Sequence, residues 1–365
     1  MKKIASIVGA RPNFIKLAPI HKLINDHVYT NIFEHIIIHT GQHYDYKLSE
    51  IFFSEFSLPP PNYNLDVGSA SPCLQIAEII KRLEHLFQSN KIDLVLVYGD
   101  TNSTFAGALA AIKSSIKVAH VESGLRSFDR EMPEEVNRIL TDHISNFLYP
   151  PTKTALKNLH SENIQGEIIY TGDISVEIIR DAETKICNSL ILERLNLEPK
   201  EYFLFTLHRS ENTNFECLKS IINIFKKIPQ LKIVFPIHPR TTRILNDIDL
   251  YKELQKCKNV KLIDPVGYID FIQLIKCATK VITDSGGTQK EAYLLNTPCI
   301  TIRNNTEWIE TINENWNILT GIDVEKTTNA IVNWHPHKTS TENPIFGNGM
   351  TSNIIVNHLK KVLER

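Results

Sequence analysis

The chain is poor in the features that mark fibrous, membrane-spanning and secreted proteins. Glycine accounts for only 14 of its 365 residues, which excludes collagen-like and low-complexity architectures. No stretch approaches the ~18 uninterrupted apolar residues that a transmembrane helix needs. The apolar run at the start is interrupted by Arg11-Pro12-Asn13, which leaves it too short for the core of a signal peptide. We therefore expect neither a membrane segment nor a signal peptide.

The chain also lacks an excess of charge of either sign. It has 40 Lys and Arg residues against 41 Asp and Glu residues, which leaves a formal net charge of −1. Proteins that bind nucleic acid through its phosphates usually carry a basic excess, so we expect no nucleic-acid partner. Hydrophobic residues make up 42% of the chain and charged residues 22%, as in ordinary globular proteins. A length of 365 residues exceeds what one compact core usually accommodates, which predicts two domains.

Cofactor and metal motifs are missing as well. The six cysteines form no Cys-x-x-Cys pair, which argues against zinc ribbons and redox dithiols and predicts reduced thiols in a cytoplasmic protein. The histidines show no His-Glu-x-x-His spacing, and there is no P-loop and no Gly-x-Ser-x-Gly elbow. No Gly-x-Gly-x-x-Gly follows the first apolar run, so the dinucleotide-binding fingerprint is absent. We expect no metal and no cofactor.

The chain does have a regular alternation of apolar runs and amphipathic stretches. Several runs are continuous Val, Ile and Leu, which is typical of parallel strands buried on both faces. The expected strands are Ile4–Val8, His35–His39, Leu94–Tyr98, Val118–Val121, Ile168–Tyr170, Phe203–Leu207, Ile233–Pro236, Val260–Ile263, Val281–Thr283 and Cys299–Ile302. The expected helices include Gln75–Phe87, Thr104–Lys113, Glu134–Ile144, Leu218–Lys227 and Phe271–Cys277. Such alternation indicates an α/β fold built on parallel sheets.

The alternation falls into two Rossmann-like halves. Between about Thr171 and Tyr202, charged helical sequence leads into a fresh strand. We expect an N-terminal domain at 1–175, a C-terminal domain at 176–350, and a final helix within 351–365 that packs back on the N-terminal domain. Ligands bind outside the carboxyl ends of the strands in open α/β sheets. The site is therefore expected in a cleft between the two halves.

Charged residues follow the expected strands of the first half. Arg11 and Lys16 lie at the start of the helix after the first strand; two cations near a helix N-terminus favour an anion such as phosphate, although they could be ordinary surface charges. Asp100 follows the strand Leu94–Tyr98 and is either a helix cap or a carboxylate that faces the cleft.

The next strand ends in His120-Val121-Glu122. The period of two in a strand would place His120 and Glu122 on one face. Glu134 and Glu135 open the following helix, where acids complement the helix dipole and need no other role. A functional role for this acidic pair and the purely structural one are both open.

In the second half, His208 and His238 each follow a strand. A histidine at such an edge can transfer a proton or contact an anionic oxygen, because its usual pKa of about 6.5 lies near neutral pH. Packing in the core is the alternative for both, and it is favoured more for His238 than for His208.

The segment around Ser285-Gly286-Gly287 is the most informative of the second half. A strand ends there and a helix follows at once. Two glycines let the backbone approach a ligand, and the free N–H groups together with the Ser285 hydroxyl can hold a diphosphate. Glu291, about one turn later, could accept hydrogen bonds from ribose hydroxyls. With the basic start of the first half, this segment favours a nucleotide ligand.

Taken together, these segments resemble those of the non-hydrolysing UDP-N-acetylglucosamine 2-epimerases, which have the two-domain GT-B architecture. The resemblance runs from about Ile4 to the final helix. It is carried by Gly9-Ala10-Arg11-Pro12…Lys16, Thr40-Gly41-Gln42-His43, Gly99-Asp100-Thr101, His120-Val121-Glu122-Ser123-Gly124-Leu125-Arg126, Pro133-Glu134-Glu135-x-Asn137-Arg138, His208-Arg209-x-Glu211-Asn212 and Thr283-Asp284-Ser285-Gly286-Gly287-x-Gln289-x-Glu291.

The resemblance implies that the enzyme inverts C2 of the sugar in UDP-GlcNAc to give UDP-ManNAc, a precursor of surface polysaccharides. UDP is eliminated to give a 2-acetamidoglucal and then re-added. By motif position, the implied catalytic residues are Asp100, Glu122, Glu134 and His208. The implied UDP-sugar contacts are Arg11, Lys16, His208, Arg209, Phe271, Ser285, Gly286, Gly287, Glu291 and Arg303. The resemblance also implies a homodimer.

Two departures from the family pattern bear on the substrate and on regulation. Many members carry Glu-Arg-Pro-Glu where this chain has Thr306-Glu307-Trp308-Ile309-Glu310, so the arginine contact is missing or is replaced by Arg303. The Trp form resembles a subgroup that acts on UDP-2,3-diacetamido-2,3-dideoxyglucuronate, which is the alternative substrate. Arginines expected near Val67–Ala70 are absent, which argues against activation by a second UDP-GlcNAc. A GT-B glycosyltransferase and a non-catalytic sugar-nucleotide sensor are the rival functions.

Overall fold

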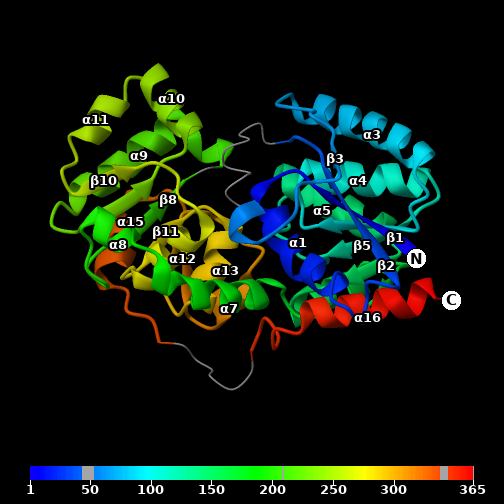
Figure 1. Cartoon of the computed structure of the whole chain (residues 1–365). Helices are drawn as coiled ribbons and strands as arrows, with labels where there is room; N and C mark the ends of the chain where they lie inside the picture. The colour runs from blue at the N-terminus through cyan, green and yellow to red at the C-terminus, as the bar shows by residue number, and fades with distance from the viewer. Residues whose placement is uncertain (43–52, 208, 338–343, 365) are drawn as a thin grey trace. The chain divides into compact units, whose positions relative to one another are not determined.

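The computed structural model describes residues 1–42, 53–207, 209–337 and 344–364. They form two compact units, one made of Met1–Arg180 with Pro344–Arg365 and the other of Asp181–Asn343. Each unit carries its own sheet flanked by helices (Figure 1). The chain therefore leaves the first unit once, builds the second, and ends in the first.

The first unit is built on a parallel sheet with the strand order β3-β2-β1-β4-β5-β6-β7. Its central strands are buried along almost their whole length, because helices cover both faces. In the register of β4 and β5, Tyr98 pairs with Val121, so that the two strands end side by side. The strands are β1 (Lys2–Val8), β2 (Phe33–His39), β3 (Tyr63–Asn64), β4 (Leu94–Tyr98), β5 (Lys117–Val121), β6 (Phe147–Tyr149) and β7 (Glu167–Ile168).

Helices connect these strands and pack on them. The helix α4 packs against α3 on one side and α5 on the other, and α16 near the C-terminus packs against α1. Small residues let α4 lie close to the sheet: a Cβ at Gly107 would come within 3.0 Å of Ile7. The helices are α1 (Arg11–Ile24), α3 (Pro72–Ser89), α4 (Asn102–Lys113), α5 (Pro133–Ile144), α6 (Lys153–Ser161) and α16 (Thr351–Leu363), and α7 (Ser175–Lys185) begins in this unit and ends in the second.

The second unit repeats this architecture with the strand order β10-β9-β8-β11-β12-β13, again all parallel. In its core Phe205 packs edge-on against Phe225 and Phe235, with ring centroids 5.0 and 4.8 Å away. The strands are β8 (Phe203–Thr206), β9 (Ile233–Pro236), β10 (Val260–Ile263), β11 (Val281–Thr283), β12 (Cys299–Thr301) and β13 (Asn317–Leu319).

The helices of the second unit follow its strands in the same alternating way. The helix α15 packs against α9 on one side of the sheet, and α12 packs against α13. The α-helices are α8 (Ile191–Leu195), α9 (Phe215–Lys227), α10 (Pro239–Asp247), α11 (Tyr251–Gln255), α12 (Tyr268–Cys277), α13 (Gly286–Leu294), α14 (Ile309–Asn313) and α15 (Val324–Asn333), with 3₁₀ turns at Ile186–Asn188 and Ser210–Thr213.

The α/β fold with two parallel sheets is confirmed. All ten expected strands overlap observed ones, whereas β3, β6 and β13, of two or three residues each, were not expected. The domain boundaries at residues 175 and 350 and the cleft between the halves stay predictions. No helix within the described residues has the length and apolarity needed to cross a membrane.

Candidate active site

The site in the first unit is centred on Gly99, just past the end of β4. Its φ of +64° lies in the left-handed region that glycine adopts easily. A Cβ at this position would lie 2.9 Å from Lys16 Nζ and 3.4 Å from Glu122 Oε1. Glycine thus leaves the room in which a lysine from α1 and a glutamate from the end of β5 meet.

Lys16 and Glu122 form an ion pair at this point, and their side chains are only 12% and 8% exposed. The backbone of Glu122 is left-handed, with φ of +69°, an uncommon conformation for glutamate. Its N–H and that of Ser123 both donate to Tyr149 O, at 3.2 and 3.3 Å. The chain has therefore turned out of the strand before Glu122.

The expectation that His120 and Glu122 share one face by strand alternation is wrong, because β5 ends at Val121. Both residues nevertheless reach Gly99. His120 Nε2 lies 2.7 Å from Gly99 O. The left-handed backbone of Glu122 directs its carboxylate toward the Cα of the same glycine.

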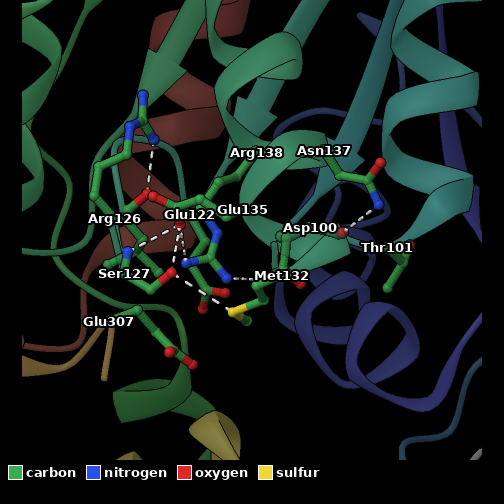
Figure 2. Close-up of polar contacts among 12 residues, drawn as sticks. Asp100, Thr101, Glu122, Arg126, Ser127, Met132, Glu135, Asn137, Arg138 and Glu307 are labelled. Atoms are coloured by element: carbon green, nitrogen blue, oxygen red, sulfur yellow. Dashed lines mark hydrogen bonds and ion pairs between the residues drawn. The ribbon is translucent and has the colours of Figure 1, made fainter. Parts of the chain in front are cut away.

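Asp100 follows Gly99, and its side chain is 31% exposed. Arg138 Nη2 donates to Asp100 Oδ2 at 2.5 Å, and Asn137 Nδ2 donates to Asp100 O at 3.0 Å (Figure 2). Asp100 is not the cap of α4, since the Thr101 hydroxyl accepts the Thr104 N–H in that position. Of the two roles open from the sequence, the structure therefore supports a carboxylate held in place by α5.

The acidic pair at the start of α5 divides into two different environments. Glu135 is completely buried and accepts hydrogen bonds from the backbone N–H groups of Ser127 and Phe128, each at 2.9 Å. Arg138 Nη1 also donates to Glu135, at 3.0 Å (Figure 2). Glu134 is partly exposed. Glu135 thus holds the preceding loop, which is more than complementing the helix dipole.

The start of α1 is fixed to the end of β4 by a buried asparagine. Asn13 Oδ1 accepts the N–H groups of Gly9 and Ala10, at 3.2 and 3.1 Å, and Asn13 Nδ2 donates to Tyr98 O at 2.9 Å. Arg11, partly exposed, is the first residue of this helix. The anchored helix start brings its positive dipole end to the same sheet edge as Asp100.

In the second unit, the turn from β11 into α13 has the geometry of an anion-binding helix start. Ser285 is the N-cap, and its Oγ accepts the Thr288 N–H at 3.3 Å. A Cβ at Gly286 would lie 1.8 Å from Glu307 Oε1, so a larger residue here would displace the Glu307 carboxylate or the turn. Gly287 is exposed, and a Cβ there would meet nothing closer than Ser285 Oγ at 3.9 Å. Gly286 thus makes room for the Glu307 side chain, and Gly287 leaves the backbone of the turn open to solvent.

Asp284 connects this turn to the loop after β8. The fully buried Asp284 carboxylate accepts the Arg209 N–H and the Asn212 side-chain amide, both at 3.0 Å. Arg209 Nε donates to Asp284 O at 3.1 Å. This contact places the Arg209 guanidinium at the peptide that directly precedes the N-cap Ser285. His208, expected to be catalytic, lies outside the described residues.

The segment that departs from the family pattern lies against the same turn. Arg303 Nη2 pairs with Glu307 Oε2 at 2.9 Å, both side chains being almost fully buried. Lys290 Nζ lies 4.3 Å from the centre of the Trp308 ring, a cation–π contact. The role of Arg303 as the replacement for a missing arginine stays a prediction.

The other residues of interest lie at different places in the second unit. Glu291 is partly exposed on α13, and Phe271 is buried on α12. His238 is exposed, and its ring nitrogen caps α10 by accepting the Arg240 N–H, so core packing is wrong for this histidine. Within the described residues, no cluster of three or more His, Cys, Asp or Glu is placed to hold a metal.

The roles of Glu135, Asn137 and Arg138 were not predicted from the sequence, although all three residues belong to a segment that carries the family resemblance. The available signal was the Glu135–Arg138 spacing of three, which brings the two side chains together on a helix. Their contacts to Asp100 and to the loop at 127–128 depend on the tertiary fold.

Two parallel α/β sheets, with polar residues gathered just past the strand ends, define a GT-B-like enzyme. The profile of the UDP-N-acetylglucosamine 2-epimerases matches residues 27–360. The chain is 52% identical over 363 residues to a UDP-N-acetylglucosamine 2-epimerase homolog of Methanococcus maripaludis, covering 99% of this chain and 100% of the relative. It belongs to the UDP-N-acetylglucosamine 2-epimerase family and is thus an isomerase-class enzyme.

More distant relatives and solved structures agree with this assignment. The UDP-2,3-diacetamido-2,3-dideoxy-D-glucuronate 2-epimerase of Pseudomonas aeruginosa is 37% identical, with 99% of this chain and 100% of the relative covered. A crystal structure of the Methanocaldococcus jannaschii UDP-GlcNAc 2-epimerase with UDP-GlcNAc and UDP is similar, with a TM-score of 0.91, 42% identity and coverage of 98% and 99%. The family resemblance seen in the sequence is confirmed.

Proposed function

We propose that this enzyme interconverts UDP-GlcNAc and UDP-ManNAc by elimination and re-addition of UDP. A carboxylate removes the C2 proton while the C1–O bond breaks and its electron pair leaves with UDP, which gives 2-acetamidoglucal. UDP then adds back to C1 as a proton reaches the other face of C2. The observation that carries the proposal is the pair of carboxylates, Asp100 and Glu122, at one sheet edge, each held by a cation.

The first unit supplies the proton chemistry in this proposal. Glu122 and Asp100 are the candidates to remove and return the C2 proton; the family resemblance adds Glu134 of the same unit and His208 of the second unit. A positioned acid or base contributes roughly 10²–10⁴-fold in rate. Lys16 and Arg138 fix the two carboxylates in direction, and which carboxylate serves which face of the sugar is left open.

The second unit supplies the leaving-group site. Because the proton at C2 is only weakly acidic, stabilising the departing UDP must lower much of the barrier. The α13 N-terminus with Ser285, Gly286 and Gly287 is suited to the diphosphate. The family resemblance adds Arg209 and Arg303 of this unit as charged contacts, with Glu291 for the ribose and Phe271, and it also adds Arg11 and Lys16 of the first unit.

The closest alternative is a different sugar on the same nucleotide. The P. aeruginosa relative acts on a diacetamido uronate by its name, and Trp308 stands where many family members carry arginine. UDP-2,3-diacetamido-2,3-dideoxyglucuronate is therefore the second candidate substrate. Either product would feed surface polysaccharide synthesis, and a cytoplasmic location stays a prediction of the cysteine pattern.

Incubation of the purified protein with UDP-GlcNAc in D₂O tests the proposal. Epimerisation predicts deuterium at C2 and the appearance of UDP-ManNAc without any acceptor. A GT-B glycosyltransferase would react only after an acceptor is added, and a sensor would bind without turnover. If UDP-GlcNAc is inert, deuterium at C2 of the diacetamido uronate identifies the alternative substrate, and inertness of both sugars contradicts the proposal.

We also propose that the enzyme is a homodimer. Val136 and Leu140 lie one turn apart on α5 and are each 41% exposed, and Leu74 on α3 is 67% exposed. Val136→Glu together with Leu140→Glu is expected to give a monomer by light scattering. Val332→Glu, at a 42% exposed valine of the second unit, is the matched control and should keep the oligomeric state.

A further inference from the structure

Glu135 lies in the first turn of α5 with no exposure to solvent. Its Oε1 accepts the Phe128 N–H at 2.9 Å, and its Oε2 accepts the Ser127 N–H and the Ser127 hydroxyl, each at 2.9 Å. Arg138 Nη1 donates to the same Oε2 at 3.0 Å (Figure 2). One buried carboxylate therefore joins the loop before α5 to an arginine within the helix.

Arg138 extends this connection to Asp100. Its Nη2 donates to Asp100 Oδ2 at 2.5 Å, and the Arg138 side chain is only 2% exposed. Nη1 and Nη2 belong to one planar guanidinium, so the direction in which Glu135 holds the first nitrogen also sets the direction of the second. The Asp100 side chain, which is 31% exposed, is thus oriented by a buried partner and stays accessible to a ligand.

The loop that Glu135 holds begins directly after Glu122 and ends where α5 starts. Within it, Phe128 has a left-handed backbone with φ of +59°, which is an outlier for a bulky residue. The Phe128 side chain is 79% exposed, so its packing contributes little to holding this conformation. The hydrogen bond from the Phe128 N–H to Glu135 therefore helps to fix the segment that follows Glu122.

We infer that Glu135 is a positioning residue that fixes Asp100, through Arg138, relative to the segment that follows Glu122. The inference rests on the proposed function to the extent that Asp100 and Glu122 act on the sugar. Because Glu135 is completely buried, its effect on the reaction must act through its partners. Small misplacements of a catalytic group are costly, so a rigid connection between the two candidate carboxylates matters for turnover.

The connection concerns the side chain of Asp100 and not its main chain. Asn137 Nδ2 donates to the Asp100 carbonyl at 3.0 Å, which supports the main chain independently of Glu135. Lys16, the cation contributed by α1, pairs with Glu122. Glu135 and Asp100 both compensate the charge of Arg138. The loss of either carboxylate therefore makes the stability of the protein more dependent on the other.

A double-mutant cycle in urea tests the connection without any substrate. We expect Glu135→Gln combined with Asp100→Asn to lose more free energy of unfolding than the sum of the two single losses. Glu177→Gln is the matched control, because Glu177 accepts the N–H and hydroxyl of Ser352 as Glu135 accepts those of Ser127. Its loss should add to that of Glu135→Gln. Simple additivity in the first pair overturns the inference, whether or not the proposed reaction occurs.

Kinetics of the single variants test the positioning role. We expect Glu135→Gln to lower kcat at least ~10-fold with KM changed less than about 2-fold, whereas Glu177→Gln should lose stability and keep both constants. Glu135→Asp keeps the buried charge but is one methylene shorter, so it should also lower kcat, and it serves if Glu135→Gln fails to fold. A rise in KM alone, or an equal loss of kcat in Glu177→Gln, contradicts positioning.

The same kinetics in an Arg138→Lys background test whether Glu135 acts through Arg138. A lysine keeps the positive charge but lacks the planar fork that reaches both carboxylates. We expect Glu135→Gln to lower kcat by less than about 3-fold in this background, because the connection to Asp100 is already broken. A full ~10-fold loss in both backgrounds would show that Glu135 acts independently of Arg138 and would overturn the inference. If wild-type protein leaves both candidate sugars unchanged, the proposed function fails, and the cycle in urea still decides the connection.

Discussion

The two units place their polar residues at the same edge of the same kind of sheet, but they build them differently. In the first unit the site consists of charged side chains in partly buried pairs, Lys16 with Glu122 and Arg138 with Asp100. In the second unit it consists of a helix start, a serine cap and an exposed glycine. Charged pairs hold groups that exchange protons, whereas a helix start holds an anion. We propose accordingly that most of the proton chemistry belongs to the first unit and most of the nucleotide contacts to the second.

The largest expected effect comes from removing a buried cation of the first unit. Arg138→Met leaves Asp100 and Glu135 without their common partner, and the loss of one partner of a buried ion pair costs about 3–5 kcal/mol. We expect that reduction in the free energy of unfolding in urea, followed by circular dichroism. Lys276→Met breaks an exposed pair with Glu183 in the second unit and should cost less than about 1 kcal/mol. Equal reductions in the free energy of unfolding for the two variants would show that the ion pairs of Arg138 contribute no more to stability than an exposed pair does.

The second expectation concerns Glu122. Glu122→Gln keeps the shape of the side chain but removes the carboxylate, and we expect kcat to fall at least ~10²-fold. Binding of UDP, measured by calorimetry, should change much less than kcat, because Glu122 is not itself among the proposed UDP contacts. A turnover close to that of the wild type would remove Glu122 from the reaction.

The glycine turn of the second unit should show the reverse behaviour. In Gly286→Ala the new Cβ would lie 1.8 Å from Glu307 Oε1, so either the turn or the Glu307 carboxylate must shift. We expect KM to rise roughly 10-fold with a smaller change in kcat, as expected when a binding contact is lost. Gly287→Ala adds a methyl group where the nearest protein atom is 3.9 Å away, so a change of KM in this variant would report hindered approach of the ligand and not crowding within the protein. A fall in kcat at unchanged KM in Gly286→Ala would contradict the division between the units.

The units should also differ in acid stability. In the first unit, burial and the nearby His21 lower the pKa of His35 to about 3, and burial lowers the pKa values of His21 and His39. The unfolded chain binds more protons than the folded chain between pH 3 and 6.5, so stability falls as pH drops through this range, by about 1.4 kcal/mol per pH unit for His35. The depressed pKa of Asp142 removes further stability in stronger acid.

Spectroscopy can separate the two units in this experiment. All three tryptophans, Trp308, Trp316 and Trp334, belong to the second unit. On titration from pH 7 to 4 we expect circular dichroism to report loss of structure before tryptophan fluorescence does. His35→Asn should bring the two transitions together. Coincident transitions in the wild type would show that the buried histidines do not set the acid stability.

The sequence predicted the parts of the fold that depend on local pattern. Continuous apolar runs located ten strands, and because parallel strands end at one edge, Asp100, Glu122 and Ser285 were expected close to the site. Strands as short as Tyr63–Asn64 carry too few residues to show a period. Their pairing is decided by the neighbouring strand, which a single segment does not reveal.

The parts of the site that could not be predicted depend on tertiary contacts. The left-handed backbone of Glu122 follows from hydrogen bonds to Tyr149. The roles of Glu135 and His120 follow from partners 7 to 22 residues away in the chain. Glu135 complements the dipole of α5, as the local sequence indicates, but its hydrogen bonds to the backbone of Ser127 and Phe128 could not be read from the sequence.

Positional isotope exchange tests the central claim most directly. UDP-GlcNAc carrying ¹⁸O in the oxygen between C1 and the β-phosphorus is incubated with the enzyme until half has been converted. If UDP leaves and returns, the label appears in the non-bridging β-phosphate oxygens of the recovered sugar nucleotide. Inversion at C2 with the label still wholly between C1 and phosphorus would show that no UDP with a freely rotating β-phosphate is formed, and would contradict the account.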